Sequence, residues 1–76
     1  FPNPSTADVN LEFNIQLSEV KFRVYDAVGQ QVMNEEGANY SAGSIATLNL
    51  VNLPEGIYFV EIDALEGKAI KRVVKQ

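Results

Sequence analysis

Ile57-Tyr58-Phe59-Val60-Glu61-Ile62-Asp63 is the stretch that decides the fold of this chain. It consists mostly of β-branched and aromatic residues, which are enriched in strands. Tyr58, Val60 and Ile62 lie two residues apart and therefore share one face of a strand. Because four consecutive apolar residues open the stretch, we expect a central strand that is buried most fully over its first half.

Further segments around this stretch predict strands, most of them because apolar and polar residues alternate with a period of two, and residues 30–34 as a short returning strand centred on Val32 and Met33. They cover residues 9–17, 20–25, 30–34, 45–50 and 68–75. In the last of them, we expect Ile70 and Val74 on one side and Lys71 and Val73 on the other. Turn signals recur about every 8 to 12 residues. These features predict an all-β fold of about seven short strands, arranged as an antiparallel β-sandwich or a small barrel.

Turn residues separate the predicted strands. Asp26 can accept a hydrogen bond from the backbone two residues on, and Gly29 can adopt a positive φ, so we expect a turn over residues 26–29. Pro54 suits the second position of a turn, and Gly56 suits a position with positive φ. The other expected connections are a tight hairpin or corner at residues 18–19, a turn at 64–67, and a mobile loop over 34–44 anchored by Tyr40.

The composition indicates one small domain and excludes several classes of function. The 76 residues include ten acidic and six basic side chains, for a net charge of −4, and contain no His, Cys or Trp. A Ser-His-Asp triad, a thiol nucleophile, a structural zinc site and a disulfide framework are therefore excluded. The acidic balance argues against nucleic-acid binding. The longest apolar runs, of about four residues, are far shorter than the roughly 20 that cross a bilayer, so no transmembrane segment is expected.

Carboxylates are the remaining candidates for chemistry near neutral pH. Asp26, Glu61, Asp63 and Glu66 could converge, and Glu61 and Asp63 lie on one strand face. Such groups can form a catalytic pair or a Ca²⁺ site. However, a chain of this length suggests no cleft, and the spacing lacks a dense Asp/Asn/Gly loop. We therefore interpret these residues as a solvated strand face, and we assign no catalytic, metal-binding or cofactor-binding residue.

Basic residues are concentrated at the end of the sequence. Four of the six, Lys68, Lys71, Arg72 and Lys75, fall within the last nine positions. Such a charge asymmetry can mark an interaction surface. Lysines on an edge strand also prevent edge-to-edge aggregation. The residues alone favour neither interpretation over the other.

Four motifs occur in order along the whole chain. They are Phe1-Pro2-Asn3-Pro4, Val24-Tyr25-Asp26-Ala27-Val28-Gly29, Leu53-Pro54-Glu55-Gly56-Ile57-Tyr58-Phe59-Val60, and Gly67-Lys68 followed by Lys71-Arg72-Val73-Val74-Lys75. Together they resemble the type A C-terminal sorting domain of the type IX, or Por, secretion system. By position, the resemblance implies these family motif residues: Pro2, Asn3, Pro4, Asp26, Gly29, Pro54, Gly56, Tyr58, Lys68, Lys71 and Val74.

The resemblance implies an Ig-like β-sandwich at the C-terminal end of a larger secreted protein of a Gram-negative bacterium. Residues 1–76 would be a single sorting domain, excised from that protein, and the covalently linked N-terminal passenger would carry the activity. The outer-membrane translocation machinery would read the folded domain in the periplasm. A sortase-like protease would then remove it, and the passenger would be attached to the cell surface or released.

The last predicted strand offers the most accessible signal for such recognition. The candidate recognition residues are Lys68, Lys71, Arg72, Val73, Val74 and Lys75. Deletion of residues 73–76 is expected to abolish export of the passenger.

The alternative is an Ig-like or fibronectin-like accessory module of a secreted hydrolase, which binds carbohydrate or acts as a spacer. Tyr25, Tyr40 and Tyr58 could form a sugar-stacking platform on a sheet face, although Tyr58 fits a core position with its hydroxyl at the rim. A sorting domain has to be the C-terminus of its gene product, whereas an accessory module can be internal.

Overall fold

Six strands form at the segments that the sequence predicts as strands. The computed structural model describes residues 8–37 and 39–75. The strands are β1 (Asp8–Glu12), β2 (Lys21–Tyr25), β3 (Gln31–Glu36), β4 (Ile45–Asn49), β5 (Gly56–Ala64) and β6 (Gly67–Lys75). The all-β prediction is confirmed. The described residues contain six strands, one for each predicted segment, rather than about seven.

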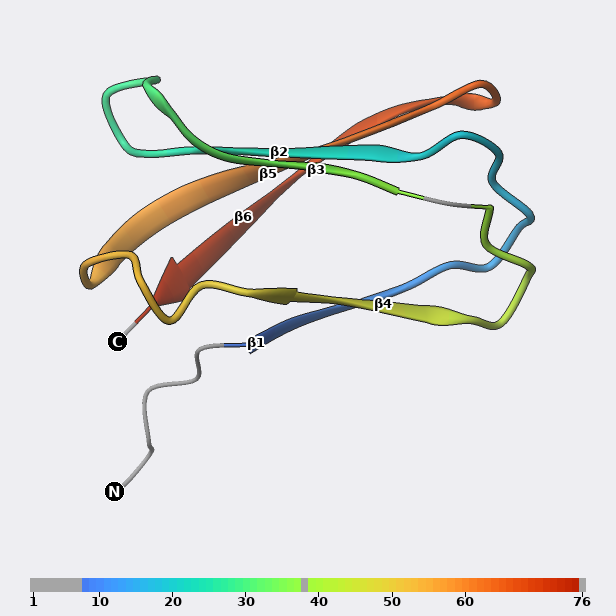
Figure 1. Ribbon diagram of the computed structural model, residues 1–76, viewed down its shortest axis with the longest axis horizontal. Coiled ribbons are helices and arrows are strands. Elements are labelled where there is room, and N and C mark those ends of the chain that lie inside the picture. Colours follow the sequence, from blue (N-terminus) through green and yellow to red (C-terminus); the bar gives the residue numbers. More distant parts are fainter. Residues whose placement is uncertain (1–7, 38, 76) are drawn as a thin grey trace.

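The strands form two antiparallel sheets (Figure 1). One sheet contains only β1 and β4, and the other has the order β3-β2-β5-β6. This arrangement is a sandwich and not a barrel. β5 lies between β2 and β6, which confirms that it is a central strand, and β6 lies at one edge of its sheet. Within the described part of the chain, no helix is long and apolar enough to cross a membrane.

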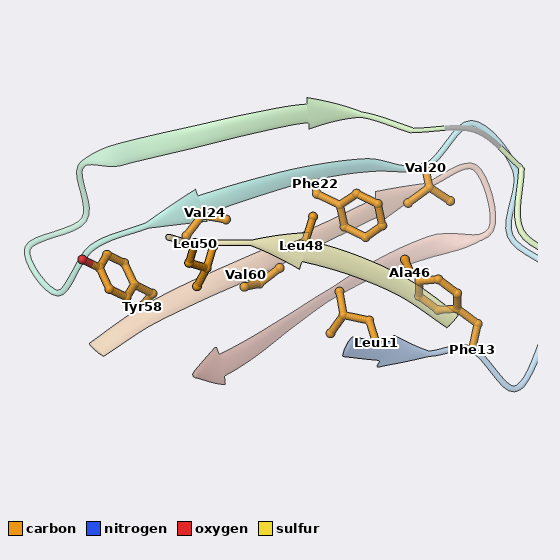
Figure 2. Packing of buried hydrophobic residues seen from close by; sticks show 10 residues of the cluster. All are labelled: Leu11, Phe13, Val20, Phe22, Val24, Ala46, Leu48, Leu50, Tyr58 and Val60. Atoms are coloured by element: carbon orange, nitrogen blue, oxygen red, sulfur yellow. The ribbon is translucent and has the colours of Figure 1, made fainter. Parts of the chain in front are cut away.

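The hydrophobic core lies between the two sheets (Figure 2). On β5, Tyr58 and Val60 are buried and Ile62 is half-buried against the same cluster, as the alternation predicts. The buried residues are Leu11, Phe13, Val20, Phe22, Val24, Ala46, Leu48, Leu50, Tyr58 and Val60.

β1 is shorter than the sequence predicts. It ends at Glu12, although the alternation continues to Leu17. The N–H of Phe13 still donates to the carbonyl oxygen of Ser44 at 3.0 Å, but the chain then bends away from the two-stranded sheet. Ile15 is consequently 60% exposed, despite its apolar position in the alternation. Residues 13–20 are therefore a corner between the sheets, which is one of the two forms predicted for residues 18–19.

The segment predicted as a mobile loop is attached to the rest of the domain by backbone hydrogen bonds. Its first part belongs to β3, which continues to Glu36 and not only to residue 34. The N–H of Gly37 then donates to the carbonyl oxygen of Val20 at 2.6 Å. Tyr40 and Leu17 exchange two backbone hydrogen bonds of 2.9 Å each. The prediction of a loose loop is therefore wrong for these residues, and Tyr40 is the anchor that was expected.

The turn between β2 and β3 forms as predicted. The Oδ1 atom of Asp26 accepts hydrogen bonds from the N–H groups of Val28, at 3.1 Å, and Gln30, at 2.9 Å. Gly29 donates its N–H to the carbonyl oxygen of Asp26 and has a φ of 89°, which residues with a side chain rarely adopt. One carboxylate and one glycine thus close this hairpin.

Of the other predicted structural motif residues, the structure describes Pro54, Gly56 and Tyr58. Pro54 lies in the turn between β4 and β5, and its carbonyl oxygen accepts a hydrogen bond from the hydroxyl of Tyr58 at 2.5 Å. Gly56 is the first residue of β5. The proline-rich entry, with Pro2, Asn3 and Pro4, lies outside the described residues.

Candidate functional site

β6 forms the edge of the four-stranded sheet and carries most of the basic residues of the chain. It pairs with β5 along its full length, from Gly67 opposite Ala64 to Lys75 opposite Gly56. Its other side has no strand partner among residues 8–37 and 39–75. Alternate residues of such an edge direct their backbone N–H and C=O groups away from the sheet. Four of the six basic side chains lie on this strand: Lys68, Lys71, Arg72 and Lys75.

Two of the predicted recognition residues take part in the fold itself. Val73 lies opposite Tyr58 and packs against the core. The Nζ atom of Lys75 donates hydrogen bonds to the carbonyl oxygens of Val51, at 3.3 Å, and Leu53, at 2.5 Å. These contacts join the end of β6 to the turn between β4 and β5. Substitution of Val73 or Lys75 would therefore change stability as well as any contact with a partner.

Lys68 belongs to an ion-pair network on the outer face of the sheet. Its Nζ atom lies 3.5 Å from Oε2 of Glu61. The NH1 atom of Arg23 lies 3.3 Å from Oε1 of Glu61 and 3.5 Å from Oδ2 of Asp63. The hydroxyl of Tyr25 donates to Oε1 of Glu61 at 3.0 Å. The network forms because the strand register places Arg23 opposite Glu61 and Lys68 opposite Asp63.

These contacts shift the pKa values of the groups involved. The hydrogen bond from Tyr25 is the largest cause of a lowered pKa of Glu61; burial opposes it, and Arg23 and Lys68 lower the pKa further. The same hydrogen bond raises the pKa of Tyr25, and the bond to Glu61 raises the pKa of Arg23. A general acid near neutral pH would need a raised carboxyl pKa. The network therefore suits strand pairing and not proton transfer.

Lys71 and Arg72 are the basic residues of β6 without an ion pair or side-chain hydrogen bond to the described residues. Neighbouring residues of a strand point to opposite faces. The side chains of Lys71 and Arg72 therefore project from opposite faces of the sheet edge. Arg72 shares the outer face with Ile70 and Val74, which are 68% and 52% exposed. Lys71 shares the other face with Val73, as the alternation predicts.

A groove of about 510 Å³ lies beside β6, between the two sheets. One wall is formed by residues 11–15 and 17, which run from β1 into the corner, and the other by the hairpin of β5 and β6. The buried or half-buried apolar side chains of the groove are Leu11, Phe13, Leu17 and Ile62. Its charged residues, which are exposed, are Glu12, Glu66, Lys68 and Lys71.

Glu66 fixes the tip of the β5–β6 hairpin at one end of this groove. Its two carboxylate oxygens accept hydrogen bonds from the N–H of Ser18, at 2.8 Å, and from the hydroxyl of Ser18, at 2.9 Å. The N–H of Leu65 donates in turn to the carbonyl oxygen of Ser18 at 3.1 Å. The bonds from Ser18 lower the pKa of Glu66. The hairpin and the corner are thus held together.

The four carboxylates considered from the sequence do not come together in one place: Glu61 and Asp63 share a contact with Arg23, whereas Asp26 and Glu66 lie elsewhere. Asp26 lies in the turn between β2 and β3, Glu61 and Asp63 lie in the outer network, and Glu66 bonds to the corner. Among residues 8–37 and 39–75, no group of three or more His, Cys, Asp or Glu side chains could hold a metal ion. This arrangement offers neither a carboxylate pair in a cleft nor a Ca²⁺ loop.

The three tyrosines do not form a shared platform either. Tyr25 bonds to Glu61 on the outer face. Tyr40 packs against Phe13, with ring centroids 5.2 Å apart, and Tyr58 is only 4% exposed. The sugar-stacking surface of the alternative interpretation is therefore absent among these residues.

Fold and site together define a small β-sandwich module. Its distinctive feature is a sheet edge that carries basic residues beside exposed apolar ones, which is a surface suited to protein recognition. The family model described as the secretion system C-terminal sorting domain matches residues 1–76, and the chain belongs to this family. No curated protein and no solved structure matches the chain.

Membership of this family establishes the role of the domain. It is the C-terminal sorting signal for type IX secretion, and the type IX machinery recognises it. A protein that carries such a domain is exported to the cell surface or secreted. The sorting domain is not itself catalytic. The family supports the sorting function over the accessory module.

Proposed function

We propose that the type IX machinery recognises this domain through β6, with Lys71 and Arg72 as the main charged contacts. The observation that carries the proposal is the contrast among the basic residues of this strand. Lys68 and Lys75 bond to other parts of the domain, whereas Lys71 and Arg72 have no such partner in the described residues. Val74, which is half exposed beside Arg72, adds an apolar contact.

The wider pathway is part of the same proposal. Residues 1–76 form one sorting domain, joined at its N-terminal side to the passenger that carries the activity. The domain crosses the periplasm before the outer-membrane translocation machinery engages it. A sortase-like protease then separates it from the passenger, which stays attached to the surface or is released. Family membership supports each of these steps.

The experiment is a reporter fusion with single charge reversals. Residues 1–76 are placed at the C-terminus of a periplasm-targeted fluorescent protein, in a bacterium with a type IX system and in a strain without one. Lys71→Glu and Arg72→Glu should each reduce export by the competent strain. Lys21→Glu is the matched control, because it makes the same charge change at an exposed position of β2. Unchanged export of both β6 variants, in a folded domain, would contradict the proposal.

Deletion of residues 73–76 is a weaker test, for a structural reason. Val73, Val74 and Lys75 pair with Tyr58, Ile57 and Gly56 of the central strand. Their removal would uncover part of β5 and would destabilise the fold together with any signal. The truncated domain therefore needs a thermal melt beside the export assay, whereas the point substitutions change exposed side chains.

A further inference from the structure

We propose that the β6 edge binds an extended, acidic segment of a partner protein, which adds to the sheet as a further strand beside the groove. The biological role of this contact rests on the proposed function, because the machinery would supply the segment. The geometry rests on the structure alone. The inference therefore concerns how the domain is recognised, and which chemistry the partner must present.

Within residues 8–37 and 39–75, no strand pairs with the outer edge of β6, so a further strand can be added there. β6 is nine residues long and lies at the edge of a four-stranded sheet, while the facing sheet has two strands. Added strands bind through main-chain hydrogen bonds, and their alternate side chains enter pockets that give specificity. The groove lies at this edge, and its lining includes Gly67, Lys68, Ala69 and Lys71 of β6.

The groove matches one face of an incoming strand. Side chains of a strand point alternately to its two faces. One face would meet the apolar side chains of Leu11, Phe13 and Leu17. The volume of about 510 Å³ is within the range of roughly 300 to 1,000 Å³ that is usual for binding pockets. The other face would lie beside Ile70 and Arg72 on the outer side of the sheet.

The charge of β6 indicates whether the added strand comes from a second copy of this chain or from a different protein. β6 contains four basic residues and no acidic one. Pairing of two β6 strands would bring their like charges together across the new pair, which destabilises a sheet. In a segment that alternates apolar and acidic residues, the apolar side chains would face the groove, whose lining includes Glu12 and Glu66, and the acidic side chains would meet Arg72 on the outer face. The occupant that fits is therefore an acidic segment with apolar residues at alternate positions, and not a second copy.

The test uses the 76-residue chain and three synthetic peptides of nine residues. The first alternates Val and Glu, the second alternates Val and Lys, and the third is the Val/Glu peptide with alternate amides N-methylated. Binding is measured by calorimetry at low and high salt, and amide hydrogen exchange locates it. We expect the first peptide to protect alternate amides of β6. The Lys peptide should not bind, and N-methylation should abolish binding because the main-chain donors are lost.

Variants of the domain separate the edge from general charge attraction. Arg72→Glu should weaken binding of the Val/Glu peptide by about tenfold, the scale of one favourable charge pair, whereas Lys71→Glu, on the groove face with the Val side chains, should weaken it less. Lys21→Glu, with the same change of net charge on β2, should leave the affinity nearly unchanged. Equal effects of the three substitutions would overturn the inference.

Other outcomes also decide the question. Protection along β3 or β1 instead of β6, equal binding of the Lys peptide, or dimerisation of the chain through β6 would each show that the occupant is a different one. If β6 variants block export but no acidic peptide binds, strand addition is wrong and recognition through β6 stands. If the peptide binds as expected but the β6 substitutions leave export unchanged, the proposed function is wrong.

Discussion

Replacing Leu48 by alanine tests whether side-chain packing between the sheets holds the sandwich together. Leu48 lies on β4 opposite Val9, and its side chain is 1% exposed within the core. Truncation of a fully buried leucine costs about 2 to 5 kcal/mol, depending on how far the cavity collapses. At about 0.05 to 0.15 kcal/mol per residue, a domain of this length has roughly 4 to 11 kcal/mol of stability. The substitution should therefore remove a large share of it.

Urea unfolding followed by circular dichroism measures this loss. We expect a lower midpoint with an unchanged slope. A loss of 2 kcal/mol should lower Tm by about 8 to 16 °C in a domain of this size. Val51→Ala is the control, because Val51 follows β4 closely in the chain and is 58% exposed, and it should cost at most about 0.5 kcal/mol. A cost below about 1 kcal/mol for Leu48→Ala, or one equal to that of the control, would refute the packing described.

Three further changes test local contacts. Asp26→Ala removes both side-chain hydrogen bonds of the β2–β3 turn and should cost about 1 kcal/mol in thermal unfolding; a neutral result would contradict the turn geometry. Gly37→Ala places a Cβ atom 2.6 Å from the carbonyl oxygen of Val20 and should cost about 1 to 3 kcal/mol, which urea unfolding would reveal. Ser18 lowers the pKa of Glu66 from 4.5, so the folded state binds this proton less readily than the unfolded state. The ionised Glu66 carboxylate therefore stabilises the fold above about pH 4.5, and this stabilisation is lost as the pH falls through the pKa of Glu66 in the folded state. In unfolding curves across this range, Glu66→Gln should reduce the acid dependence, and an unchanged pH profile would argue against the bonds to Ser18.

The parts of the fold that depend on local pattern could be predicted from the sequence. The alternation of Val20, Phe22 and Val24 and the turn chemistry of Asp26 and Gly29 act over a few residues, and both are confirmed. Ile15 shows the limit of such patterns. It continues a local alternation, but the chain turns between the sheets there and leaves it exposed.

The candidate site was predictable only in outline. The gathering of basic residues on the last strand is visible in the sequence. Which of them have partners depends on register and on contacts with distant segments: Lys68 meets Glu61, and Lys75 meets the turn between β4 and β5. The groove needs the corner to lie beside the β5–β6 hairpin, and no local pattern encodes that placement.

The two ends of the described chain lie at the same pole of the sandwich. Asp8 pairs with Asn49 at the end of β4, and Lys75 bonds to the turn that follows β4. Figure 1 shows the start of β1 and the end of β6 in the same half of the molecule. The contact of Glu66 with Ser18 lies at the far end of β6. A partner bound at the hairpin tip would therefore be separated from both ends of the described chain by the length of the nine-residue strand β6.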